Sequence, residues 1–196
     1  FHRIYVTYDK PRTDGTFWGV QYMPTRYREI LEWSCSWAKG KDNPDDIVND
    51  IWLGCWNLGD QGFYYELIDP PRGLDRLLSQ KNGACGEWES LFHALIESQG
   101  IDVSGMGIIL DREKYPPEFI DPIWYLWRYQ TYSVQTMGWP APMVWVFPDH
   151  GFPIYNNNVY DLCFLKALGY TYQAYEDVLF EKFLDPFDDQ EYVNNP

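Results

Sequence analysis

The sequence lacks the features that mark several large classes of protein. It has no apolar run near the roughly 20 residues that a membrane-spanning helix requires. Basic residues are scarce: 15 Lys and Arg stand against 29 Asp and Glu, and the net charge of −14 argues against binding to a nucleic-acid backbone. The 3 histidines show no HExxH spacing, and the chain has no CxxC pair. We therefore expect no membrane span, no nucleic-acid partner, no metal ion and no cofactor.

Cysteine is also scarce, and its spacing excludes a disulfide-rich fold. Only 4 cysteines are present, and they stand far apart in the chain. We expect Cys35, Cys55 and Cys163 to be buried thiols. Cys163 stands two residues from Asp161 on a predicted strand, so it would point to the same face as that carboxylate.

Aromatic residues, by contrast, are abundant. The chain has 10 Trp, 16 Tyr and 11 Phe among 196 residues, which excludes a disordered chain and provides for a real core. This length predicts one main domain. We assign residues 25–196 to it and read residues 1–24 as an N-terminal strand segment, the tail of a preceding module. Since the sequence begins at Phe1 rather than Met, we expect an exported or multidomain parent protein.

Hydrophobic periodicity and turn residues predict helices first and a sheet second, which is an α+β order. The segment 111–139, rich in Trp, Tyr and Pro, is predicted to be irregular with short strands. The predicted helices are 25–39, 44–58, 84–98 and 173–184, with one or two further turns at 74–78. The predicted strands are 3–8, 103–110, 143–147, 150–155 and 159–164.

Cys85 opens the most strongly periodic of these helices. A thiol in the first helical turn faces unpaired backbone N–H groups and the positive end of the helix dipole, which is one way that the pKa of a thiol is lowered. Gly83 and Gly86 flank it and keep side chains away from the sulfur. The apolar residues within about 80° of Cys85 around this helix are Trp88, Phe92, Leu95 and Ile96.

A nucleophilic thiol needs a proton carrier and a group that orients it, and His150 and Asp161 are the residues able to provide them. The run of three asparagines at 156–158 suits the positive-φ positions of a tight hairpin, in which partner numbers would add up to about 314. That register leaves His150 and Asp161 about three positions apart, roughly 10 Å. We expect a β-bulge near residues 151–153 to close the gap, since Pro153 cannot donate to a ladder.

Two segments resemble a known family. Residues 82–102 (NGACGEWESLFHALIESQGID) resemble the nucleophile helix of the transglutaminase-like superfamily, which shares the papain-like thiol-enzyme core, and the Cys-Gly-Glu-Trp run is similar to the peptide:N-glycanase branch. Residues 149–162 (DHGFPIYNNNVYDL) resemble the family's His strand, hairpin and Tyr-Asp strand. The resemblance implies a nucleophile helix packed on a small antiparallel sheet. It implies Cys85 as nucleophile, His150 as general base and acid, and Asp161 as the orienting carboxylate.

The expected activity is attack on an amide carbonyl of a protein or peptide through a thioester. We expect the oxyanion to be held by the backbone N–H of Cys85 and place Gln61, Gly86 and Trp88 at the oxyanion hole or substrate groove. Water as acceptor gives a protease, amidase or deamidase, and an amine gives a transglutaminase-type acyltransferase; we favour hydrolysis, since nothing suggests a separate amine site. The alternative from another class is a catalytically silent binding or structural module, with the aromatic segment 115–145 as its ligand surface.

Overall fold

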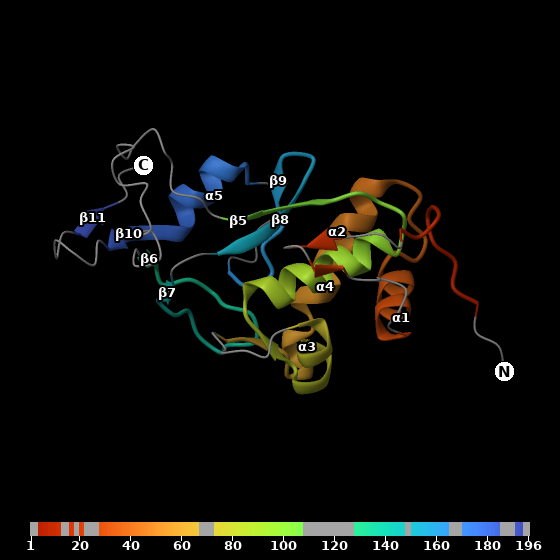
Figure 1. Ribbon diagram of the computed structural model, residues 1–196, viewed down its shortest axis with the longest axis horizontal. Helices are drawn as coiled ribbons and strands as arrows, with labels where there is room; N and C mark the ends of the chain where they lie inside the picture. Colours follow the sequence, from red (N-terminus) through yellow and green to blue (C-terminus); the bar gives the residue numbers. More distant parts are fainter. Residues whose placement is uncertain are drawn as a thin grey trace.

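The computed structural model of the protein is a mixed α+β structure (Figure 1). It describes residues 4–12, 16–17, 20–21, 28–66, 73–107, 128–147, 150–164, 170–184 and 191–193.

Five α-helices and one 3-10 turn lie within these ranges. They are α1 (Arg28–Trp37), α2 (Pro44–Trp56), η2 (Gly59–Gln61), α3 (Leu74–Gln80), α4 (Cys85–Glu97) and α5 (Tyr172–Leu179).

The strands form small sheets. One three-stranded antiparallel sheet has the order β5 (Ser104–Gly107), β8 (Gly151–Tyr155), β9 (Asn158–Val159). A four-stranded sheet has the order β11 (Glu191–Val193), β10 (Phe180–Leu184), β6 (Arg128–Thr131), β7 (Val146–Phe147). The two-stranded pairs are β1 (Thr16–Phe17) with β2 (Val20–Gln21), antiparallel, and β3 (Tyr64–Tyr65) with β4 (Asn82–Gly83), parallel.

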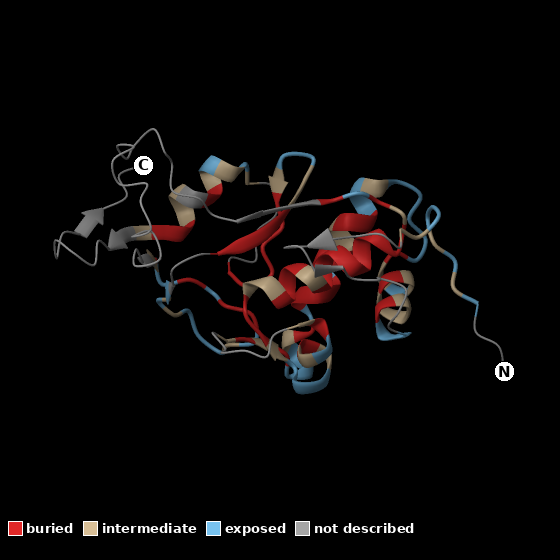
Figure 2. Ribbon diagram, in the orientation of Figure 1, coloured by how far each residue is buried: buried red, intermediate tan, exposed pale blue. Residues whose placement is uncertain are grey.

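Helix α4 is the centre of the fold. It packs against α1, α2 and α3 and, on another side, against strand β8 (Figure 1). The side chains of Trp88, Phe92 and Leu95 are completely buried, and the red of buried residues in Figure 2 concentrates on α4, α2 and β8. The fold therefore holds the helix that Cys85 opens between other helices and the sheet.

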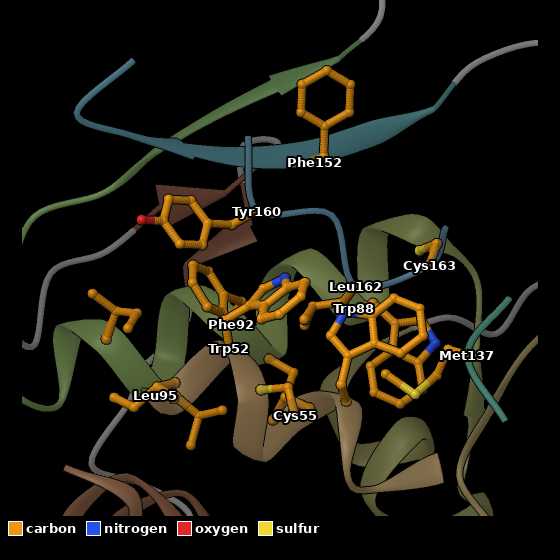
Figure 3. Close-up of a cluster of buried hydrophobic side chains, with 14 of the residues drawn as sticks. Trp52, Cys55, Trp88, Phe92, Leu95, Met137, Phe152, Tyr160, Leu162 and Cys163 are labelled. Atoms are coloured by element: carbon orange, nitrogen blue, oxygen red, sulfur yellow. The ribbon is translucent and has the colours of Figure 1, made fainter. Parts of the chain in front are cut away.

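Aromatic and aliphatic side chains fill the space between α2, α4 and the chain after β9 (Figure 3). Phe92 stacks on Tyr160, with ring centroids 5.7 Å apart and planes 21° apart. The indole N–H of Trp52 donates to the backbone oxygen of Asp161 at 3.2 Å. Because this bond joins α2 directly to the residue expected to orient the histidine, core packing and the candidate site are physically linked.

Most of the predicted helices are confirmed, and the second shows why. Asn43 caps α2 by accepting a hydrogen bond from the Asp46 backbone N–H at 2.9 Å, and Pro44 takes the first helical position, as its sequence predicts. Helix α4 ends at Glu97, and the turn after it includes Gly100, whose φ of +80° belongs to the left-handed region that favours glycine.

The structure corrects the two ends of the prediction. In the predicted strand 3–8, the described residues 4–8 form no strand. Instead the chain runs along the end of α4, where the Asp9 and Arg12 backbone N–H groups donate to the carbonyls of Gln99 and Glu97. The predicted helix 173–184 ends at Leu179, and residues 180–184 form β10, paired with β6 and β11. Residues 180–184 have a helical periodicity, but pairing with strands distant in the sequence determines their structure.

The strands predicted between these ends are present but shorter. The described parts of segments 103–110, 143–147 and 159–164 contain β5, β7 and the end of β9, and residues 108–110 lie outside the described ranges. Of the predicted irregular excursion 111–139, residues 111–127 also lie outside them, and the remainder includes β6. Among the described residues, no helix is both long and apolar enough to cross a membrane.

Truncation of Leu95 to alanine is the direct test of this core. Leu95→Ala removes a completely buried side chain from α4, and we expect it to lower the free energy of unfolding by about 2–5 kcal/mol. The matched control is Leu53→Ala in α2, where the side chain is 40% exposed and the expected loss is under about 1 kcal/mol. Urea unfolding of both variants measures the difference, and equal losses would contradict the central position of α4.

Candidate active site

Cys85 is held at the first position of α4 by the strand pair that precedes it. β4 ends at Gly83 and pairs with β3, where the Glu66 backbone N–H donates to the Gly83 carbonyl at 3.0 Å. Gly83 allows a close approach, since a Cβ there would lie 2.9 Å from the Cβ of Glu87. The strand pair therefore holds the residues that lead into α4, and the Cys85 side chain lies half-buried where the strand pair and the helix meet.

The Glu87 carboxylate ties the start of α4 to the start of α3. One oxygen accepts the backbone N–H of Ala84, and the other accepts that of Gly73, each at 3.0 Å. Glu87 is 3% exposed; its hydrogen bond from Ala84 is buried, and the one from Gly73 is partly buried. A carboxylate here also complements the helix dipole. The backbone N–H groups of the first helical turn, at Cys85 and Gly86, have no acceptor within the helix, which makes this end an anion-binding position.

His150 and Asp161 meet in the interior. His150 stands immediately before β8, and its Nε2 lies 3.0 Å from Oδ2 of Asp161. The two side chains are 0% and 2% exposed. The ring of Phe164 packs on the imidazole, with centroids 4.9 Å apart. Since a carboxylate can only accept, Nε2 is the ring nitrogen that carries the proton toward Asp161, and Nδ1 has the lone pair in the neutral ring.

The predicted hairpin is confirmed, but its predicted bulge is wrong. Ile154 pairs with Val159, so partner numbers add up to 313, within one of the expected sum, and Asn156 and Asn157 have φ of 48° and 62°. β8 stays in an unbroken register with β5. The Tyr160 backbone N–H still donates to the Pro153 carbonyl at 3.0 Å, and the gap closes because the chain leaves the ladder after this residue.

The Asp161 side chain holds the chain beyond β9 in a tight bend. One carboxylate oxygen, Oδ1, accepts the Cys163 backbone N–H at 2.7 Å. The other, Oδ2, accepts the Phe164 backbone N–H at 3.2 Å and also the hydroxyl hydrogen of Tyr175. This local bend, rather than a bulge, brings the carboxylate to the histidine.

The imidazole connects Asp161 to Cys85. Burial alone would lower the pKa of His150, but the charge and hydrogen bond of Asp161, joined by the hydrogen bond and charge of Cys85, outweigh it and raise that pKa from 6.5 to about 10. Because Nε2 is engaged by Asp161, Nδ1 is the atom that can exchange a proton with the Cys85 thiol. The three residues singled out in the sequence are therefore brought together in the order Cys85, His150, Asp161.

Cys163 lies at the same place. Its sulfur, a nitrogen of His150 and an oxygen of Asp161 lie within 4.8 Å of one another, and all three residues are buried. Such a group could hold a metal ion, but here both Asp161 oxygens accept hydrogen bonds. Burial raises the pKa of the Cys163 thiol well above its ordinary value, with Asp161 and Cys85 adding to the effect, which favours the protonated thiol over the metal-binding thiolate. We therefore still predict that no metal ion binds at this group of residues.

The remaining predicted residues have different positions. Gln61 is exposed on η2. Within the described structure its backbone N–H donates to the Leu58 carbonyl, and its backbone carbonyl accepts from the Lys81 ammonium. Trp88 is completely buried, and its indole N–H donates to the Gly83 carbonyl, so its position gives no support to a role in a groove. A Cβ built at Gly86 meets no heavy atom within 4 Å, which leaves open space beside Cys85.

Two of the expected buried thiols are confirmed and one is not. Cys55 and Cys163 are buried, whereas Cys35 is half-buried like Cys85. The Cys35 sulfur lies near the end of α4, where it accepts from Nε2 of Gln99 at 3.6 Å. In the aromatic segment 115–145, residues 115–127 lie outside the described ranges, and Trp139 and Trp145 are half-buried. Trp139 donates its indole N–H to the Tyr65 carbonyl, and Trp145 packs on the Tyr65 ring at 5.0 Å, which is the behaviour of core residues.

Sequence reasoning missed Tyr175, the hydroxyl partner of Asp161. Tyr175 stands within the predicted helix 173–184, where periodicity marks it only as an apolar position and does not indicate that its hydroxyl binds a particular carboxylate. Sequence reasoning also missed Glu89, one helical turn after Cys85, whose buried carboxylate fits against Gly151, where a Cβ would lie 2.5 Å from Oε2. The i, i+4 spacing from Cys85 is the signal that could have marked Glu89.

Comparisons of the chain with models of known protein families, with curated proteins and with solved structures each found no match.

Replacement of Glu87 tests how the start of α4 is held. Glu87→Ala leaves the N–H groups of Gly73 and Ala84 without their carboxylate acceptor, and we expect the free energy of unfolding to fall by about 1–3 kcal/mol. Asp75→Ala, which removes an exposed acidic side chain from the first turn of α3, serves as the control and should cost under about 0.5 kcal/mol. Thermal or urea unfolding of the two variants decides, and a Glu87→Ala protein as stable as the control would contradict this role.

The raised pKa of His150 gives the stability a definite pH dependence. A group whose folded pKa is raised contributes stability below its unfolded pKa, near 6.5, and loses it as the pH rises toward about 10. Between pH 6.5 and 8.5 we expect the free energy of unfolding to fall by about 2 kcal/mol through this group. The decline should be absent from His150→Gln, and urea unfolding across this range measures both proteins. Parallel curves for the two would contradict the His150–Asp161 interaction.

Proposed function

We propose that this protein is a thiol enzyme of the transglutaminase-like, papain-related kind, which attacks an amide carbonyl through Cys85, His150 and Asp161. The observation that carries the proposal is the buried imidazole, held by Asp161 through one nitrogen and interacting with Cys85. The packing of α4 on β8 and the sequence resemblance support it further.

The first half of the reaction forms a thioester. The Cys85 thiolate, whose proton is already on Nδ1 of His150, attacks the carbonyl carbon, and the carbonyl electron pair moves onto the oxygen. The backbone N–H groups of the first turn of α4, which Cys85 opens, are the donors that stabilise this oxyanion. When the tetrahedral intermediate collapses, His150 donates its proton to the nitrogen of the leaving amine and the C–N bond breaks.

The second half releases the acyl group. His150, now neutral, takes a proton from a water molecule as the water oxygen attacks the thioester. The C–S bond then breaks, which restores the Cys85 thiolate beside the protonated His150. The balance is one amide and one water consumed, with one carboxylic acid and one amine produced. We propose a protein or peptide amide as substrate and hydrolysis as the main outcome; an amine in place of water would give an acyltransferase.

The reactivity of Cys85 tests this proposal without a known substrate. We expect iodoacetamide to alkylate Cys85 at least about tenfold faster than Cys35 at pH 6, since an imidazole beside a thiol promotes the thiolate. Cys35 is the control because it is also half-buried but lies on α1, where its sulfur has the Gln99 amide as partner instead of an imidazole. Peptide mass spectrometry of time-quenched samples gives both rates in one experiment.

The same labelling in His150→Ala shows where the reactivity comes from. We expect the advantage of Cys85 over Cys35 to disappear in this variant, while Cys55 and Cys163 stay unlabelled in the folded protein because they are buried. If wild-type Cys85 reacts no faster than Cys35, the enzyme proposal fails, and a binding or structural module is the reading that replaces it.

A further inference from the structure

Tyr175 stands at the back of the candidate site. It lies on α5, which follows the hairpin in the chain, and is 2% exposed. Its hydroxyl donates to Oδ2 of Asp161, the same oxygen that faces Nε2 of His150. Its ring packs on Phe152 of β8, with centroids 4.7 Å apart at 60°, so the hydroxyl is aimed by a fixed aromatic contact.

The Tyr175 hydroxyl lowers the basicity of the Asp161 carboxylate that binds His150. Oδ2 accepts from Tyr175, from the Phe164 backbone and from the imidazole, whereas Oδ1 accepts from the Cys163 backbone. Each donor stabilises the carboxylate anion and makes it less basic. The backbone donors are local to the bend, but Tyr175 is a side chain from another element, placed on the oxygen that binds the histidine.

We propose that Tyr175 is a positioning residue of the site, whose hydroxyl fixes the Asp161 carboxylate and takes up part of its negative charge, so that the imidazole is not held too tightly to give up its proton. The inference rests on the proposed function, in which His150 must pass a proton to the leaving amine. A carboxylate with no such partner would retain the proton on the imidazole and slow that step.

Tyr175 is suited to remain a donor. Burial, and then the charge of Asp161, raise the pKa of its hydroxyl well above the ordinary value, so it keeps its proton over the range in which the protein would work. Among the described residues, the other titratable groups at the imidazole are Cys85 and Cys163, with Glu89 of α4 packed beside Gly151. The Tyr175 hydroxyl can be removed by replacement with phenylalanine while the ring stays in place.

The experiment is a titration of the His150 imidazole by NMR in protein carrying Cys85→Ala, so that the thiol does not titrate with it. On this background Tyr175→Phe removes the hydroxyl and keeps the ring on Phe152. We expect the titration midpoint of His150 to move upward by about 0.5–1 pH unit, because a carboxylate with one donor fewer binds the imidazolium more strongly.

Tyr160→Phe is the matched control. It removes the hydroxyl of another tyrosine in the same region, one that donates to Asn49 at 3.1 Å. We expect its His150 midpoint to equal that of the background. If Tyr175→Phe leaves the midpoint unchanged, lowers it, or moves it no more than the control does, the positioning role is overturned. Circular dichroism before the titration shows that each variant is folded. If Tyr175→Phe unfolds, Tyr175→Leu, which also lacks the hydroxyl and is smaller than tyrosine, provides the second test.

The outcome is separable from that of the proposed function. Iodoacetamide labelling of otherwise wild-type protein reports whether Cys85 is reactive, and the titration reports only how Asp161 holds His150. An unreactive Cys85 therefore ends the enzyme proposal whatever the titration gives. A reactive Cys85 with an unmoved midpoint ends the role of Tyr175 alone.

Discussion

The hydrogen bond between His150 and Asp161 is the interaction on which the candidate site depends. Both side chains are buried, and a buried charge is costly unless its partners satisfy it. Asp161 meets this requirement with donors from its own bend and from α5, and its backbone oxygen accepts the indole N–H of Trp52 from α2. Asp161 therefore joins the hairpin, two helices and the histidine at one point, through its carboxylate and its backbone oxygen together.

The sequence was informative where a local rule decides the structure. Asn43 and Pro44 define the start of α2, and the asparagine pair at 156 and 157 defines a turn with positive φ at both positions. Cys85 could be placed at a helix start because a long segment with helical hydrophobic periodicity follows it, with Gly83 before this segment and Gly100 after it. These features depend on neighbours within a few residues, so they can be read without knowledge of the rest of the chain.

The sequence was uninformative where distant groups compete. The predicted C-terminal helix continues as β10 because residues 180–184 find partners in β6 and β11. Asp161 reaches His150 through a bend that its own carboxylate stabilises, a device that strand register alone does not reveal. Tyr175 looked like a core residue, since an aromatic ring gives the same periodic signal whether or not its hydroxyl has a buried partner. Long-range contacts of this kind decide the chemistry of the site, although the helix that carries Cys85 is set locally.

Acylation by an activated ester tests the central claim most directly, because it requires Cys85 to act as a nucleophile. The protein would be mixed with p-nitrophenyl acetate, quenched with acid and mapped by peptide mass spectrometry, beside His150→Ala and Asp161→Asn. The account expects an acetyl group on Cys85 that forms rapidly in the wild type and is lost again to water, with both steps slowed in the two variants. An unmodified Cys85, or acetylation at equal rates in all three proteins, would contradict it.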